Sequence, residues 1–117
     1  GLGIFKGEVK NFRMINKFCK IPHLGWNQAK INPSASINKL SLNPFNNMTN
    51  NQNLFYFVHS FVVLPNNSKV ILTETNYDKV KFCSSILNKN VFASQFHPEK
   101  SGNFGLKVMK NFFSRFQ

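Results

Sequence analysis

The stretch that decides the fold is Val91-Phe92-Ala93-Ser94-Gln95-Phe96-His97-Pro98-Glu99-Lys100-Ser101-Gly102. It begins as an apolar strand that ends at His97, and Pro98 disfavours helical geometry at the residue before it. Glu99, one of only 4 acids in the chain, follows two residues later. A carboxylate that accepts a hydrogen bond from one imidazole nitrogen fixes the tautomer and leaves the other nitrogen able to take a proton. The triplet therefore predicts a base and its orienter without a nucleophile, although by spacing alone it also fits a surface turn with a chance acid.

The residues after this stretch predict an amphipathic helix from Asn103 to Arg115. Ser101, Gly102 and Asn103 are capping residues, and apolar side chains then recur at helical spacing. We expect this Phe and Met stripe to be ordinary core packing.

The residues before it favour strands. Leu54 to Leu64 is a dense aromatic and β-branched run, interpreted as one buried central strand interrupted by the polar pair His59-Ser60. A turn at 65–68 then leads into a second predicted strand, Lys69 to Thr75, so that the two strands resemble a hairpin.

A second hairpin is predicted from Lys81 to Ile86 and Val91 to Phe96, with a turn at 88–90 between them. Closer to the start, the first ten residues predict a loop that leads into a short strand, and Ile21 to Gln28 suits a loop or strand end near the surface. Lys30 to Asn53 is rich in Asn, Ser and Pro, which favours a long exposed connection with one short element around Ile37 to Leu42.

Length and composition set limits on the protein class. A chain of 117 residues with 42% hydrophobic side chains holds one small domain or a large piece of one. No run approaches the roughly 18 apolar residues of a membrane helix, and the start lacks the layout of a signal peptide, so we expect a soluble, cytoplasmic protein without membrane partners. The two cysteines, Cys19 and Cys83, are expected to be reduced, and no ligand cluster supports a zinc site.

The formal charge of +11 raises the possibility of nucleic-acid binding. However, thirteen of the 15 cationic residues are Lys, whereas phosphate and base recognition favours the guanidinium fork of Arg. We therefore expect no nucleic-acid partner and attribute the charge to compositional drift.

The string Gln95-Phe96-His97-Pro98-Glu99 resembles the histidine and glutamate segment of triad (class I) glutamine amidotransferases. Three further strings narrow the resemblance to the glutaminase subunits of imidazole glycerol phosphate synthases, and it extends over essentially the whole chain. These strings are Pro22-His23-Leu24-Gly25-Trp26-Asn27, Tyr56-Phe57-Val58-His59-Ser60-Phe61 and Lys100-Ser101-Gly102. The resemblance implies that His97 is the catalytic base and Glu99 its orienter.

Two kinds of departure from the family pattern stand out. Leu24 replaces a common methionine, and Phe61 replaces a common tyrosine, which removes a phenolic hydroxyl near the substrate. More importantly, the Gly-x-Cys-x-Gly turn of the family nucleophile does not occur in this sequence. Cys19 and Cys83 lie in Lys-Phe-Cys-Lys and Lys-Phe-Cys-Ser, without the small residues of a nucleophile turn, and are interpreted as packing residues.

The resemblance also implies binding roles. Ser60 and Phe61 match the segment that holds the substrate glutamine, largely through main-chain groups, whereas His59 is expected to be a buried structural histidine bonded to a neighbouring carbonyl. The residues that match the face docked on a cyclase subunit are Trp26, Asn27, Tyr56 and Lys100. Exposed Trp and Tyr are common interface anchors, although Trp26 could instead belong to the core.

The fold that the resemblance implies is a three-layer α/β domain with a mixed central sheet. Residues 1–117 are expected to be a partial domain, its C-terminal portion, with strands and hairpins plus the last helix. Apolar surface would remain uncovered, which predicts marginal stability and an inactive isolated chain. The implied enzyme uses covalent catalysis without metal or organic cofactor, and passes ammonia to the cyclase of a heterodimer in histidine biosynthesis.

The sequence leaves two alternative functions open. One is a related amidotransferase for GMP, anthranilate or surface-sugar synthesis; the strings around Gly25 and Lys100 argue against the first two but not against the third. The other is a degenerate, basic nucleic-acid-binding fragment, which would bind RNA or DNA in a salt-sensitive manner.

Overall fold

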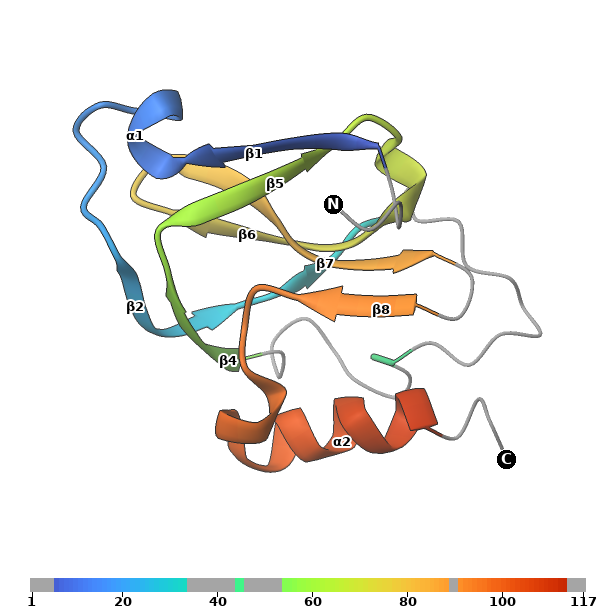
Figure 1. Cartoon of the computed structure of the whole chain (residues 1–117). Coiled ribbons are helices and arrows are strands. Elements are labelled where there is room, and N and C mark those ends of the chain that lie inside the picture. The colour runs from blue at the N-terminus through green and yellow to red at the C-terminus, as the bar shows by residue number, and fades with distance from the viewer. Residues whose placement is uncertain (1–5, 34–43, 46–53, 89–90, 114–117) are drawn as a thin grey trace.

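The computed structural model describes residues 6–33, 44–45, 54–88 and 91–113 (Figure 1). These residues form eight strands and two α-helices, with one helix after the first strand and the other after the last. The strands are β1 (Gly7–Asn11), β2 (His23–Gln28), β3 (Lys30–Ile31), β4 (Leu54–His59), β5 (Phe61–Pro65), β6 (Ile71–Tyr77), β7 (Val80–Asn88) and β8 (Val91–Ser94). The helices are α1 (Phe12–Ile15) and α2 (Gly102–Phe113), and short 3-10 turns span Ser68–Val70 and Pro98–Lys100.

The strands form two sheets, in which every described pair is antiparallel. The larger sheet has the order β1-β5-β7-β6-β3, with β8 also paired to β7, and the smaller sheet consists of β2 and β4. β7 is the central strand. It pairs with β6 on one side, and on the other side with β5 at Cys83 and with β8 from Ser85 to Asn88. α2 packs against β4 and lies at the bottom of the view in Figure 1.

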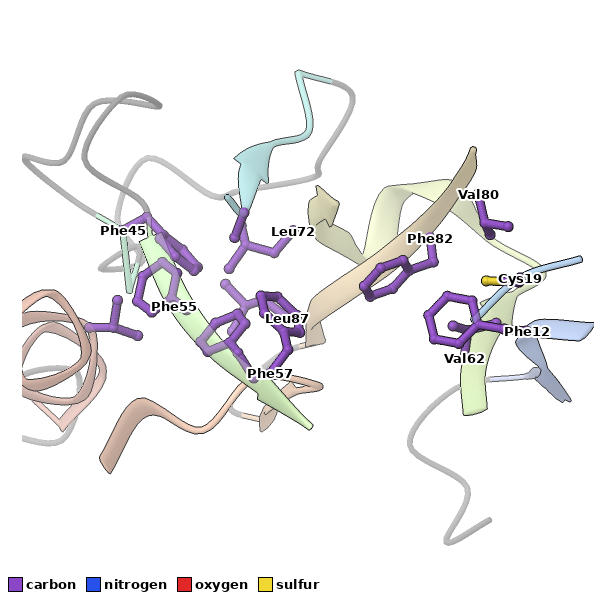
Figure 2. Close-up of a cluster of buried hydrophobic side chains, with 13 residues drawn as sticks. Phe12, Cys19, Phe45, Phe55, Phe57, Val62, Leu72, Val80, Phe82 and Leu87 are labelled. Atoms are coloured by element: carbon purple, nitrogen blue, oxygen red, sulfur yellow. The ribbon is translucent and has the colours of Figure 1, made fainter. Parts of the chain in front are cut away.

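An aromatic core fills the space between the sheets and α2. Phe82 on β7 lies between two groups of buried side chains, with Phe12 and Val62 at one end and Phe45 and Phe55 at the other (Figure 2). Phe12 and Phe82 meet edge to face, with ring centroids 5.4 Å apart. The burial of these rings, together with that of the aliphatic side chains around them, stabilises the fold.

The run from Leu54 to Leu64 is not one strand, contrary to the prediction from its continuous apolar content. The chain bends at Ser60 and passes from the small sheet, where β4 pairs with β2, to the large sheet, where β5 pairs with β1 and β7. The hairpin predicted between this run and Lys69–Thr75 is therefore also wrong, although β6 itself is a strand. Its true hairpin partner is β7, through a two-residue turn in which Asp78 and Lys79 have φ of 47° and 68°.

The other predicted elements follow the sequence more closely. The hairpin of β7 and β8 is confirmed, as are the short strand near the start and the helix, which begins at Gly102 and is described to Phe113. The segment at 21–28, predicted as a loop or strand end, forms the strand β2 over most of its length. The connection predicted to be wholly exposed contains β3 and the buried Phe45, which is 1% exposed; the element expected at 37–42 lies outside the described residues. No helix in the described part of the chain is long and apolar enough to span a membrane.

Candidate functional site

His97 lies on an extended segment that is bonded to the edge of β4. Phe96 forms a bridge with Phe57, and the His97 N–H donates to the Tyr56 carbonyl at 2.9 Å. The backbone of His97 has φ −101° and ψ 99°, and Pro98 begins the following 3-10 turn. The expectation that a proline keeps this histidine extended is therefore confirmed.

His97 and Glu99 form the contact that their spacing predicts. The His97 Nδ1 lies 2.9 Å from the Glu99 Oε1, and the two side chains are 37% and 56% exposed. The Glu99 main-chain N–H, and then His97, lower the pKa of this carboxyl below its usual range, so that Glu99 is ionised at neutral pH. An ionised carboxylate only accepts hydrogen bonds, so Nδ1 carries the proton and Nε2 is left as the basic nitrogen.

Ser101 ties the histidine segment to β4. Its side chain, in a residue only 1% exposed, donates to the His97 carbonyl at 2.5 Å and accepts from the Tyr56 N–H at 2.9 Å. Tyr56 therefore holds the segment through both of its main-chain groups. The sequence places Ser101 among the capping residues and in the string Lys100-Ser101-Gly102, but neither signal predicts that its hydroxyl joins the His97 segment to β4.

Gly105 allows α2 to pack closely against the segment from His97 to Ser101. A Cβ atom at this position would lie 1.9 Å from the Pro98 carbonyl oxygen and 2.8 Å from the Ser101 Cβ, so only glycine fits. The one signal in the sequence was a glycine inside a predicted helix, where alanine is normally the better residue.

Ser60 and Phe61 form the bend between β4 and β5. The Ser60 carbonyl accepts from the Phe12 N–H at 3.1 Å, and the Phe61 carbonyl is 2.9 Å from the His59 Nδ1. Burial lowers the pKa of His59, the Phe61 carbonyl opposes this shift, and the charge of His97 adds to it. His59 has the expected carbonyl partner, although its ring is half-buried rather than buried.

The outer face of the β2–β4 sheet exposes an apolar ladder, which we define as Leu24, Trp26, Leu54, Tyr56 and Val58. Trp26 and Tyr56 are cross-strand partners whose rings meet edge to face with centroids 6.0 Å apart. Trp26 is 58% exposed, so the alternative that it belongs to the core is wrong. Exposed apolar groups in a contiguous arrangement are typical of interaction surfaces.

The two other residues predicted for docking lie differently. Lys100 is exposed and precedes Ser101, whose hydroxyl is bonded to Tyr56. Asn27 does not share the face of its neighbour Trp26, because side chains alternate along a strand. Its amide nitrogen is 3.2 Å from the His23 Nε2 and donates to the Asn76 carbonyl at 2.9 Å, on the inner side of the sheet.

Neither cysteine has the properties of a nucleophile. Cys19 and Cys83 are free thiols, 1% and 4% exposed. Burial raises the pKa of both, and the charge of Glu74 helps to raise that of Cys83 to about 12. Both thiols therefore remain protonated and inaccessible at neutral pH, which confirms their interpretation as packing residues. Among residues 6–33, 44–45, 54–88 and 91–113, no three His, Cys, Asp or Glu side chains gather in a way that could hold a metal ion.

Comparison with known families agrees with this geometry. The model of the family described as "Glutamine amidotransferase class-I" matches residues 9–116. Among curated proteins, the chain is similar to an imidazole glycerol phosphate synthase subunit HisH 2 of Methanococcus maripaludis, with 43% identity over 115 residues, 98% of this chain and 52% of the relative.

Two further relatives carry the same subunit name. The protein of Acinetobacter baylyi is 43% identical over 111 residues, which cover 95% of this chain and 50% of the relative. The protein of Methanocaldococcus jannaschii is 45% identical over 112 residues, with coverage of 96% and 50%. The chain thus spans about half the length of the curated relatives that it matches.

Proposed function

The chain belongs to the class-I glutamine amidotransferases, and from this premise we propose that it carries the general base and the orienting carboxylate of a glutaminase that supplies ammonia for imidazole glycerol phosphate synthesis. The observation that carries the proposal is the 2.9 Å contact between the His97 Nδ1 and the Glu99 Oε1. It lies on a segment that β4, Ser101 and α2 hold in place. The names of the relatives support the pathway.

The proposed reaction begins with a cysteine thiol that neither Cys19 nor Cys83 can supply, because both are buried. The Nε2 of His97 takes the proton of that thiol, and the thiolate attacks the side-chain amide carbon of glutamine. The tetrahedral intermediate collapses to a glutamyl thioester as the protonated His97 gives its proton to the departing ammonia. Water, deprotonated by the same nitrogen, then releases glutamate and restores the thiol.

Glu99 acts through His97 in this scheme. Its carboxylate keeps the proton on Nδ1 and stabilises the imidazolium that forms when Nε2 accepts a proton. The substrate glutamine is proposed to lie against the main chain at Ser60 and Phe61.

The apolar ladder is the proposed docking face for a cyclase subunit in a heterodimer. Trp26 and Tyr56 provide the aromatic anchors, Lys100 a cation, and Asn27 lies at the inner side of the same strand. The main chain of Tyr56 holds the His97 segment, so one residue contacts both the proposed partner and the proposed base. Such an arrangement would let ammonia pass directly to the cyclase.

Glutamine hydrolysis by the natural protein that contains this chain, measured with its cyclase, tests the proposal. We expect Glu99→Gln to lower kcat strongly and Glu8→Gln to leave it unchanged. Glu8 is a matched control because it is an exposed acid on β1 that forms an ion pair with Lys10 at the surface. Equal activity in both variants, or no glutaminase activity with a cyclase present, contradicts the proposal. If no glutaminase activity is found, salt-sensitive binding to RNA or DNA is the alternative function to test.

A further inference from the structure

We propose that His23 and Asn27 are positioning residues, which fix the tautomer of His59 and so hold the main chain at Phe61. The functional part of this inference rests on the proposed function, because Phe61 belongs to the proposed glutamine site. The structural part, which concerns the placement of protons, stands independently of any enzymatic activity.

The four groups form a continuous line of hydrogen bonds across the inner face of the β2–β4 sheet. The Asn27 Nδ2 is 3.2 Å from the His23 Nε2, and the His23 Nδ1 is 2.9 Å from the His59 Nε2. The His59 Nδ1 is then 2.9 Å from the Phe61 carbonyl oxygen. Each imidazole therefore uses both ring nitrogens.

The two ends of this line determine where every proton lies. A carbonyl only accepts, so the His59 Nδ1 carries a proton and its Nε2, in the neutral ring, must accept. The His23 Nδ1 must then donate, and its Nε2 accepts from the Asn27 amide. The direction of that amide is fixed in turn, because its Nδ2 donates to the Asn76 carbonyl at 2.9 Å and its Oδ1 accepts from the Gln28 N–H at 2.7 Å.

Packing prevents the His23 ring from adopting another arrangement. His23 is 2% exposed and stacked between Tyr77 and Phe57, with ring centroids 4.1 Å and 4.6 Å away. A rotation of this ring would require both aromatic neighbours to move. Both histidines thus carry their proton on Nδ1, a pattern that the Phe61 carbonyl supports as an acceptor at one end and the Asn27 amide supports as a donor at the other.

The placement of Asn27 gives the line its functional meaning. Asn27 follows Trp26 in β2, so one strand exposes a docking anchor outward and holds the origin of the hydrogen-bond line inward. The other end of the line is the bend at Phe61. If Asn27 loses its amide, we expect the His59 ring to lose its fixed tautomer and the Phe61 carbonyl its donor.

The tautomers can be determined directly on the chain of 117 residues labelled with 15N-histidine, by long-range 1H–15N correlation spectra. We expect protonation on Nδ1 in both His23 and His59. In Asn27→Asp, a carboxylate replaces the amide donor, so the His23 proton should move to Nε2. Asn76→Asp is the matched control, because Asn76 contributes only its main-chain carbonyl, and its spectra should keep the original pattern.

The positioning role is tested in the natural protein that contains this chain. We expect Asn27→Asp to raise the KM for glutamine about tenfold with a smaller change in kcat, corresponding to the loss of about one hydrogen bond. Protonation of His23 on Nε2 in the unmodified chain, or an unaltered tautomer in Asn27→Asp, overturns the proton placement whatever the enzyme does. A reversed tautomer with an unchanged KM overturns the positioning role alone, and neither result bears on His97 as the proposed base.

Discussion

Gly105→Ala gives a test in which helix propensity and tertiary packing predict opposite signs. By propensity alone, alanine in a helix interior stabilises a protein by about 1 kcal/mol relative to glycine. In this structure the new methyl would lie 1.9 Å from the Pro98 carbonyl oxygen and 2.8 Å from the Pro98 carbonyl carbon. Both atoms belong to the main chain, which cannot move aside as a flexible side chain can.

The expected magnitude follows from these two effects. Overpacking costs about 1–3 kcal/mol, and the upper end applies here because the obstructing atoms are main chain. Subtracting the gain in propensity leaves a net destabilisation of about 2 kcal/mol. For a urea slope of about 2 kcal/mol per molar, the unfolding midpoint should fall by about 1 M.

The assay is urea unfolding of the full chain, followed by far-ultraviolet circular dichroism in sucrose, which raises the stability of all variants. Leu106→Ala is the control, since Leu106 is the next residue of α2 and is 62% exposed. We expect its midpoint to change little. A Gly105→Ala chain that is as stable as the original, or more stable, refutes the close approach of α2 to the Pro98 segment.

Three further predictions concern acid stability, thiol reactivity and docking. Burial, and then the charge of His59, lower the pKa of His23 to about 4 from 6.5, so below pH 6.5 the unfolded chain binds a proton that the folded chain does not. The free energy of unfolding should therefore fall by up to about 3 kcal/mol between pH 6.5 and 4 through His23 alone, which urea midpoints across this range would measure. A His23→Gln chain should lose this part of the slope and keep the part that comes from His59, whose pKa burial also lowers. Cys83, whose pKa is raised to about 12, should react with a thiol reagent far more slowly in the folded chain than in urea, and equal rates would contradict its burial. Trp26→Ala should weaken cyclase binding by about 2 kcal/mol in titration calorimetry, whereas Met14→Ala, exposed on α1, should not.

The sequence predicted those features that depend on local chemistry. The contact of His97 with Glu99 follows from a proline between the two residues and a separation of two positions. The hairpin of β7 and β8 follows from the turn residues between the two strands. The start of α2 follows from the capping residues and the helical spacing of apolar side chains after them. Each of these signals lies within a few residues of the structure it predicts.

Features that depend on distant partners could not be predicted in the same way. The passage from β4 to β5 at Ser60 is marked in the sequence only by the polar pair His59-Ser60, with neither Gly nor Pro, so the sequence favours one long strand. The turn at Asp78 and Lys79 uses positive φ values without the glycine that normally indicates them. The hydrogen bond from the Asn27 amide to the Asn76 carbonyl joins residues 49 positions apart, which only the folded chain brings into reach.

The central claim is that His97 is the base of a glutaminase, and the most direct test is His97→Asn in the natural protein that contains this chain. Steady-state glutamine hydrolysis should be measured with the cyclase present, against the unmodified protein. We predict a fall in kcat of about 100-fold or more, because general base catalysis contributes a factor of this order. The unfolding midpoint should change little. Full activity in His97→Asn would contradict the claim.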